Sequence, residues 1–244
     1  MKKILLLLWL LPFHTLATTW AETTVTDPIK PDTTCVVYEP MSSGGYIYNW
    51  PSKYDMVFWP RADYHGIWYC EDSGFIAFIG DFEGLSEPEK QRISEHLKNG
   101  PPQLDSRLVV LQHLESVYSL RDKSAVFHNQ LLRVLAYSYE QLGSIDIANQ
   151  YRADALAAIY TALDSNELEE AEHLEYLYLT VNYELQLGDS AKSEVQKRKL
   201  QNTILNVKDP DLLGFSEYLT TLLDDLPYME PGGILAPTRK SDID

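Results

Sequence analysis

Residues 135–143, LAYSYEQLG, decide the fold of the larger part of this chain. Apolar residues recur there at spacings of three and four up to Gly143, and Ala148 and Ala155 follow. Such spacings place side chains on one face of a helix. A glycine lets the chain turn sharply, and small side chains let the next helix pack closely. We therefore expect a tight helical hairpin over this stretch.

A second copy of the pattern, YELQLGD, occupies residues 183–189. Its glycine, Gly188, lies 45 residues after Gly143 (188 − 143). The two copies are similar to the helical hairpins of tetratricopeptide (TPR) repeats, whose regular period is about 34 residues. Because the interval here is longer, we predict a TPR-like antiparallel helical array rather than a regular solenoid.

Helical periodicity extends on both sides of these copies. Residues 86–89, SEPE, have the form of a capping box, in which Ser86 caps a helix and Glu89 reaches back to it. That helix should end at Asn99-Gly100, and Asp105 can cap the next one. Short polar turns then separate five further predicted helices, at residues 124–142, 146–163, 167–187, 190–207 and 211–226. We expect a helical domain over 86–226 and a disordered tail over 227–244.

The segment 32–85 has a different composition, rich in aromatic residues, glycine and proline. Short runs of this kind between turn-forming residues are typical of strands and hairpins. The predicted strands lie near Thr34–Tyr38, Gly45–Trp50, Gly66–Tyr69 and Phe75–Ile79. The whole chain is therefore expected to be an α+β protein, with a small β-rich subdomain before the helices.

The N-terminus has the pattern of a secretory signal peptide. Lys2 and Lys3 precede an apolar run over Ile4–Leu11, and small-residue cleavage sites follow at Ala17 and Ala21. The run is shorter than the about 20 residues that a membrane-spanning helix needs. We expect residues 1–21 to act as a signal peptide and the mature protein to be periplasmic or secreted, without a membrane span.

The charge of the chain disfavours nucleic acid as a partner. The formal net charge is −16. Removal of Lys2 and Lys3 with the signal peptide would make it −18 (−16 − 2). So acidic a chain repels phosphates, and no basic stripe offsets the repulsion. The hydrophobic fraction of 45% is sufficient for a packed core.

Three N-terminal segments carry a resemblance to a known family: DMVFWP (55–60), WYCEDSGFIAF (68–78) and DFEGLS (81–86). With the helical array, they resemble a family of uncharacterised bacterial proteins that join an N-terminal zinc ribbon to C-terminal TPR-like helices. In that family two C-x-x-C knuckles supply four thiols. Here Cys35 and Cys70 each open a knuckle, but Tyr38 and Ser73 stand where the second thiols would be. The resemblance implies a degenerate zinc-ribbon-like subdomain and no specific activity.

Zinc binding is not expected from this degenerate ribbon, because structural zinc sites use four Cys or His ligands. The first cysteines of two knuckles surround the same metal, so the resemblance places Cys35 and Cys70 within reach of a disulfide. Export into an oxidising compartment favours that bond, and two free buried thiols are the alternative. The sequence carries no motif for a cofactor.

Three functions remain open on the sequence. The leading interpretation is a non-enzymatic protein whose helical array binds a protein or peptide on its concave face. An envelope hydrolase that uses Asp63 and His65 is the first alternative, although no hydrolase motif is present. The second alternative is a carbohydrate-binding module that uses the aromatic residues of the N-terminal segment. We favour instead the interpretation that these residues form the core of the β-rich subdomain. They are Tyr46, Tyr48, Trp50, Tyr54 and Trp59.

Overall fold

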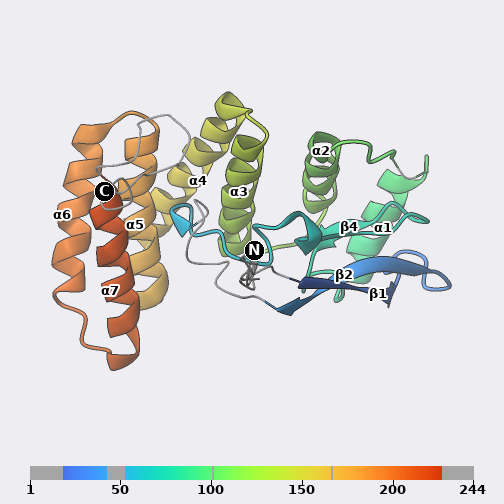
Figure 1. Cartoon of the computed structure of the whole chain (residues 1–244), viewed down its shortest axis with the longest axis horizontal. Coiled ribbons are helices and arrows are strands. Elements are labelled where there is room, and N and C mark those ends of the chain that lie inside the picture. The colour runs from blue at the N-terminus through green and yellow to red at the C-terminus, as the bar shows by residue number, and fades with distance from the viewer. Residues whose placement is uncertain (1–18, 43–52, 101, 166, 227–244) are drawn as a thin grey trace, which may run out of the picture.

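The computed structural model describes residues 19–42, 53–100, 102–165 and 167–226. Within these ranges the chain forms two small antiparallel sheets, and then a row of helices (Figure 1). The strands are β1 (Thr19–Thr26), β2 (Thr34–Ser42), β3 (Ile67–Tyr69) and β4 (Ile76–Phe78). The helices are α1 (Glu87–Leu97), α2 (Arg107–Tyr118), α3 (Ala125–Gln141), α4 (Ile145–Ser165), α5 (Glu170–Gln186), α6 (Ser190–Ile204) and α7 (Pro210–Asp225). The predicted α+β class is confirmed.

Three of the predicted strands are present. Strand β2 begins at Thr34 as expected and runs on to Ser42, while β3 and β4 pair with each other as a short hairpin. The strand predicted at Gly45–Trp50 lies outside the described residues. Strand β1 was not predicted, because its first residues were assigned to the signal peptide; it pairs with β2, with Val25 opposite Cys35. Most of the expected signal peptide and the tail 227–244 also lie outside the described residues.

A disulfide between Cys35 and Cys70 joins the two sheets. Both half-cystines are buried, and their Cα atoms lie 4.8 Å apart. The Ser73 Oγ accepts a hydrogen bond from the Phe75 N–H at 3.0 Å. The serine therefore stabilises the turn into β4.

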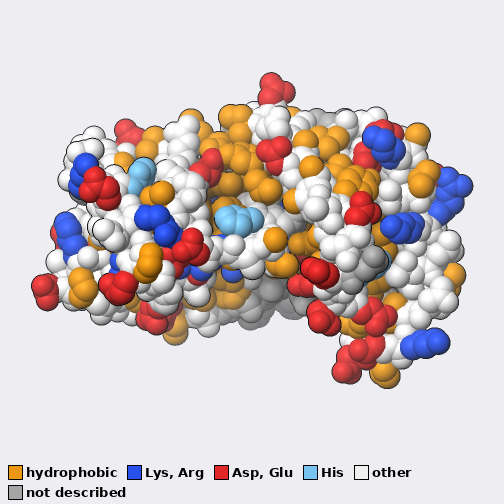
Figure 2. Space-filling view, turned by 180° about the vertical axis from the view of Figure 1, so that it is seen from behind, with side chains coloured by type: hydrophobic (Ala, Val, Ile, Leu, Met, Phe, Trp, Pro, Cys, Tyr) orange, Lys and Arg blue, Asp and Glu red, His pale blue; other side chains and the backbone are white. Residues whose placement is uncertain are grey.

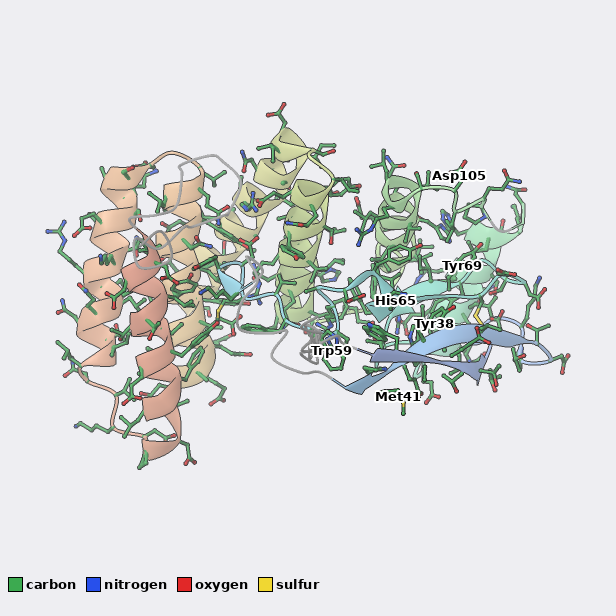
Figure 3. All side chains as sticks on the ribbon, in the orientation of Figure 1. Tyr38, Met41, Trp59, His65, Tyr69 and Asp105 are labelled. Carbon is green, nitrogen blue, oxygen red and sulfur yellow. A yellow bond between two sulfur atoms is a disulfide. The ribbon has the colours of Figure 1, made fainter. Side chains whose placement is uncertain are left out.

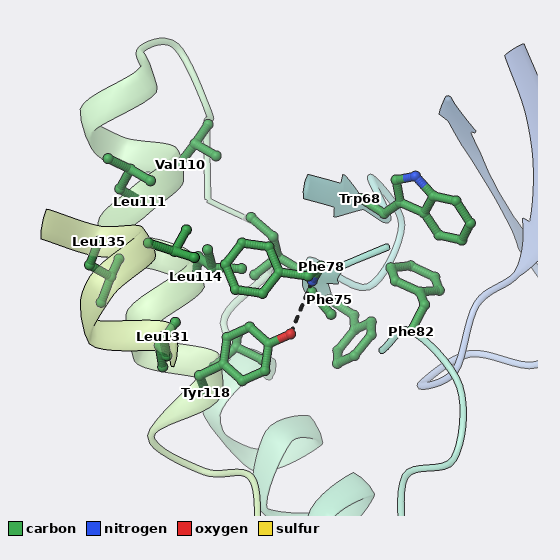
Figure 4. Packing of buried hydrophobic residues seen from close by; sticks show 14 of the residues in the cluster. Trp68, Phe75, Phe78, Phe82, Val110, Leu111, Leu114, Tyr118, Leu131 and Leu135 are labelled. Atoms are coloured by element: carbon green, nitrogen blue, oxygen red, sulfur yellow. Dashed lines mark hydrogen bonds between the residues drawn. The ribbon is translucent and has the colours of Figure 1, made fainter. Parts of the chain in front are cut away.

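The first hydrophobic core lies between the sheets and helices α1 to α3 (Figure 4). Phe75 and Phe78 from the β3–β4 hairpin pack there against Phe82 and Tyr118. The Tyr118 hydroxyl accepts a hydrogen bond from the Phe78 N–H at 3.0 Å and donates one to Asp81 at 2.8 Å. The core thus continues across residue 85 from the strands into the first helices.

Helices α3 to α6 form two antiparallel hairpins that end as the repeat pattern predicts. The Gly143 N–H donates to Glu140 O at 2.8 Å and the Ser144 N–H to Tyr139 O at 2.9 Å, with Gly143 at φ +75°. The turn at Gly188, with φ +92°, repeats these hydrogen bonds. This is the Schellman ending of a helix, which favours glycine because the backbone is left-handed there.

The predicted helix boundaries are mostly correct to within three residues. The capping box at Ser86 and Glu89 is present. Helix α2 is capped by Ser106, whose Oγ accepts from the Val109 N–H at 3.3 Å, and not by Asp105 as predicted. Ala148 and Ala155 are fully buried, as expected for close packing of α4 on α3.

A second hydrophobic core lies among α4 to α7. Its members come mainly from α5, which is buried along most of its length. Two residues from far away in the sequence, Tyr54 and Met56, also belong to it. The segment 53–56 therefore leaves the strands and packs into the helical array.

Candidate functional site

The first candidate surface, the face of the helical array near α5, is occupied by the chain itself. The segment 53–56, called here the inserted segment, runs in front of the helices toward α3 (Figure 1). The Asn182 amide on α5 donates to Tyr54 O at 2.6 Å, and Gln186 donates to the Asp55 carboxylate at 3.2 Å. Met56 is left-handed, with φ +52°. Side chains of the array thus bind the main chain of a tight turn.

A buried group of charges fixes the inserted segment. Arg152, which is 0% exposed, donates to Asp55 at 3.2 Å and also pairs with Glu140. Burial alone lowers the pKa of Arg152, but Asp55 and Glu140 outweigh it and raise that pKa above its usual value. At the other end, the Tyr54 hydroxyl donates to Asp225 on α7 at 2.8 Å. A partner at this face would have to displace a segment held by buried ion pairs.

The second candidate surface is a cavity of about 230 Å³ between the loop 61–64, α2 and α3. Its walls combine apolar and polar side chains, among them Arg61, Asp63, Tyr64, Ile67, Arg107, Val110, Leu111, Tyr137 and Leu142. Hydrophobic side chains also gather over the middle of the molecule on the face opposite to that of Figure 1 (Figure 2).

The two arginines of the cavity are held differently. Arg61 donates to Gln130 at 2.8 Å, and its guanidinium lies 5.5 Å from the ring centre of Phe127. Arg107 is the first residue of α2, and its guanidinium stacks 5.2 Å from the ring centre of Tyr64. Among the residues that the structure describes, none forms a hydrogen bond or ion pair with Arg107. Its charge is therefore available to a ligand.

Tyr137 lies on α3, and its side chain is only 5% exposed. Burial raises the pKa of its hydroxyl, Asp55 and Glu140 raise it further, and Arg107 acts in the opposite direction. The hydroxyl therefore stays protonated at neutral pH and can donate a hydrogen bond. No side chain or carbonyl in the described part of the chain accepts that hydrogen bond.

The structure brings Asp63 and His65 together, as the hydrolase alternative requires. Asp63 Oδ1 lies 3.1 Å from His65 Nδ1 and accepts from the His65 N–H at 2.9 Å. The imidazole contacts the ring of Trp20 at a ring-centre distance of 5.3 Å. It also contacts the ring of Tyr38, at 5.2 Å (Figure 3). No serine, threonine or cysteine of the described ranges contacts His65, so the pair has no nucleophile beside it.

The aromatic residues that the carbohydrate-binding alternative would use do not lie together in the described part of the structure. Tyr54 is buried, as expected for a core residue, but in the second core among the helices rather than in the core of the β-rich subdomain. Trp59 is half-buried and packs 5.7 Å from Trp20, centre to centre. Tyr46, Tyr48 and Trp50 lie outside the described residues. The structure therefore shows no row of exposed tryptophans within the ranges it describes.

One group of side chains among the described residues has the spacing of metal ligands: Asp27, Cys35 and Cys70. Both sulfurs of this group are used in the disulfide, and Asp27 accepts hydrogen bonds from the main chain of Ile29 and Lys30. Structural zinc needs thiolate ligands, so these residues do not fit a zinc ion while the disulfide is formed.

No family model, curated protein or solved structure matches this chain. In the described part of the molecule no helix combines the length and apolar character needed to cross a membrane. The inserted segment and the pair formed by Arg107 and Tyr137 were not identified from the sequence. Nothing in the spacing of these residues signals the contacts, because their partners lie on other elements.

Proposed function

We propose that this exported, TPR-like protein binds another protein or a peptide through its helical array, without enzymatic activity. The binding surface in this proposal is the place where α2 and α3 meet the loop 61–64. The cavity there carries the proposal, because it combines apolar walls with polar groups that the described residues leave unpaired. Such a combination is typical of binding pockets.

The inserted segment supports the choice of this surface over the face near α5. Arg133 donates to the carbonyl of Met56 at 3.4 Å, and Asn182 binds the carbonyl of Tyr54. Side chains of α3 and α5 therefore bind peptide carbonyls, but the chain itself supplies the segment that they hold. The cavity beside Arg107 is open by comparison, and Leu142, which lines it at the end of α3, is exposed.

Site-specific photo-crosslinking tests the proposal. A photoreactive phenylalanine at Leu142, which borders the cavity, should give one discrete protein adduct in envelope extracts. The same residue at Leu205, which is 82% exposed at the end of α6, is the matched control. Arg107→Gln should abolish the adduct at 142. Equal adducts from both positions, or an adduct that Arg107→Gln leaves unchanged, would show that the cavity is not the binding surface.

The contact between Asp63 and His65 supports a second candidate, an envelope hydrolase. A carboxylate that accepts from the imidazole Nδ1 orients the ring so that Nε2 can act as a general base toward water. Hydrolysis of nitrophenyl esters and glycosides by the purified protein tests this candidate. Activity that His65→Gln removes, with the fold retained by circular dichroism, would establish it in place of pure binding.

A further inference from the structure

The cavity holds two donors that the described residues leave without an acceptor: the Arg107 guanidinium and the Tyr137 hydroxyl. Tyr137 is more than nine-tenths buried, so water has little access to the rest of its side chain. The Tyr137 hydroxyl is not one of the fully buried, unpaired polar atoms of the described residues; it is open to the cavity, where an acceptor on a ligand can reach it. The two donors approach the cavity from different helices, α2 and α3. Their convergence points to one acceptor group on a ligand.

The charges around the cavity identify that acceptor as an anion. The chain has a formal net charge of −16, yet two arginines line this cavity. Asp63, the carboxylate of the cavity, already accepts two hydrogen bonds from His65. Arg107 also stands in the first turn of α2, where the helix dipole favours negative charge. A guanidinium binds a carboxylate through paired N–H groups, and a tyrosine hydroxyl can donate to the same group.

The apolar walls restrict the kind of carboxylate. Ile67, Val110 and Leu111 line the cavity beside the two donors. Its volume of about 230 Å³ lies below the about 300–1,000 Å³ of pockets that enclose a drug-sized ligand. A single residue therefore fits better than a large molecule. At the C-terminus of a peptide, the carboxylate and the side chain are attached to the same Cα atom. An apolar C-terminal residue therefore matches the two donors and the neighbouring apolar side chains of the cavity.

We propose that the cavity binds the C-terminal residue of a partner polypeptide, with its carboxylate toward Arg107 and Tyr137 and its apolar side chain against Ile67, Val110 and Leu111. This inference rests on the proposed peptide-binding function and names the chemistry of the partner. An acidic side chain within a peptide offers the same carboxylate without the adjacent apolar group. A small organic acid offers both groups without the peptide chain.

Ligand-observed NMR with the full protein and synthetic peptides tests the proposal. The probe is N-acetyl-Gly-Ser-Gly-Leu with a free C-terminal carboxylate, and its matched control is the same peptide with a C-terminal amide. We expect the free acid to bind at least tenfold more tightly, with the strongest saturation transfer to the leucine methyl groups. Arg107→Gln should weaken the free acid about tenfold and leave the amide unchanged.

Two further variants separate recognition from folding. Tyr137→Phe keeps the buried ring and removes the hydroxyl, and it should weaken the free acid severalfold. Arg198→Gln is the control, because Arg198 is exposed on α6 and donates only to the carbonyl of Glu194 in its own helix. It should leave binding unchanged. Equal binding of acid and amide, or of wild-type and Arg107→Gln, would overturn the proposal.

Two more probes distinguish the sources of the carboxylate. N-acetyl-Gly-Glu-Gly-Ser amide carries an internal acid, and N-acetyl-leucine carries the terminal group alone. N-acetyl-leucine should bind nearly as tightly as the free-acid tetrapeptide, because the cavity holds a single residue. If the internal acid binds as tightly as the free-acid tetrapeptide, the assignment to a polypeptide C-terminus is wrong. A crosslinked adduct at position 142 that persists in that case would leave the proposed function standing. Loss of this adduct together with all peptide binding would contradict both the proposed function and the proposed C-terminal site.

Discussion

The two ends of this molecule are stabilised in different ways. The N-terminal region, β1 to β4 with α1 and α2, combines a disulfide with closely packed aromatic rings such as Phe75 and Phe82. The C-terminal region, α4 to α7 with the inserted segment, has no cysteine. Both regions bury ion pairs, but the pairs around Arg152 are completely buried and join the helices to a segment distant in the sequence. Helix α3 contributes to both cores, since Leu135 belongs to the first and Leu132 packs against the second.

This difference follows from what each region can bury. Short strands supply few apolar contacts, so a covalent link that limits the unfolded chain makes a large relative contribution. Long helices bury enough apolar surface to hold together, and they can accommodate polar groups if these are paired. The two regions should therefore respond differently to loss of a charge and to loss of the disulfide.

Removal of Asp55 should cause the largest loss of stability. Asp55→Ala leaves Arg152 buried with one carboxylate fewer, and breaking a buried ion group typically costs about 3–5 kcal/mol. Chemical denaturation followed by circular dichroism measures the change. The exposed Asp224→Ala is the control and should alter stability by less than about 0.5 kcal/mol. Equal effects of the two substitutions would show that the inserted segment does not stabilise the helices.

Loss of the disulfide should have the next largest effect. Cys35 and Cys70 are 35 residues apart, and closing a loop of that length stabilises by about 3–4 kcal/mol in the chain-entropy model. We expect the double Cys→Ser variant to lose hydrogen-exchange protection in the β strands while α5 remains protected. Non-reducing peptide mapping should recover the two cysteines as one linked pair. Uniform loss of protection, with α5 included, would contradict the independence of the second core.

Acid should weaken the first core through Glu89. Burial alone raises the pKa of Glu89, but hydrogen bonds from Ser86, the Asp122 N–H and Arg121 lower it from 4.5 to about 2. Because the folded pKa is the lower one, this stabilisation is present above about pH 4.5 and is lost as pH falls toward 2. At about 1.4 kcal/mol per pKa unit, a change of this size corresponds to about 3 kcal/mol.

Denaturation of the wild-type protein and Glu89→Gln at pH 7 and pH 3 checks this prediction. The variant should be less stable at pH 7, and the difference between the two proteins should shrink at pH 3. Glu87→Gln, a change at an exposed carboxylate of the same helix, is the control. A difference between wild type and Glu89→Gln that is independent of pH would contradict the assignment.

The smallest expected effect concerns the N-terminal end of β1. Cleavage after Ala17 keeps β1 whole, whereas cleavage after Ala21 removes Trp20, whose ring packs against Trp59 and His65. We therefore expect exported protein to begin at Thr18, and a chain begun at Glu22 to be less stable by about 1 kcal/mol, the usual size of one aromatic contact. Intact-mass analysis of exported protein and denaturation of the shortened chain measure the two quantities.

Local features of the sequence were read correctly where short-range physics determines them. Ser86 with Glu89, and Gly143 with Ala148, act within a few residues, so capping and turn rules suffice. The Cys35–Cys70 bond was also predicted, with the help of a family resemblance that nothing in the structure tests. Strand β1 was missed because its sequence overlaps the expected signal peptide, and a leader and a strand are both rich in apolar and small residues.

The candidate site was predictable only in part. Asp63 and His65 are two residues apart, so their contact could be anticipated from a turn. The cavity depends on how α2 crosses α3, and no motif marks Arg107 or Tyr137. The inserted segment carries Tyr54, which was interpreted as core of the β-rich subdomain but packs among the helices instead. Long-range packing of this kind is decided by the whole fold and not by local propensity.

The inserted segment also bears on the order in which the chain can fold. Asp55 pairs with Arg152, 97 residues later, Tyr54 contacts Asn182, 128 residues later, and Lys53 pairs with Asp225, 172 residues later. Contacts of such large sequence separation form slowly, because long loops must close first. During synthesis the contacts of Lys53 and Tyr54 with Asp225 therefore cannot form until α7, the last described helix, has emerged. A nascent chain that stops before α7 should consequently be the form most exposed to chaperones and proteases.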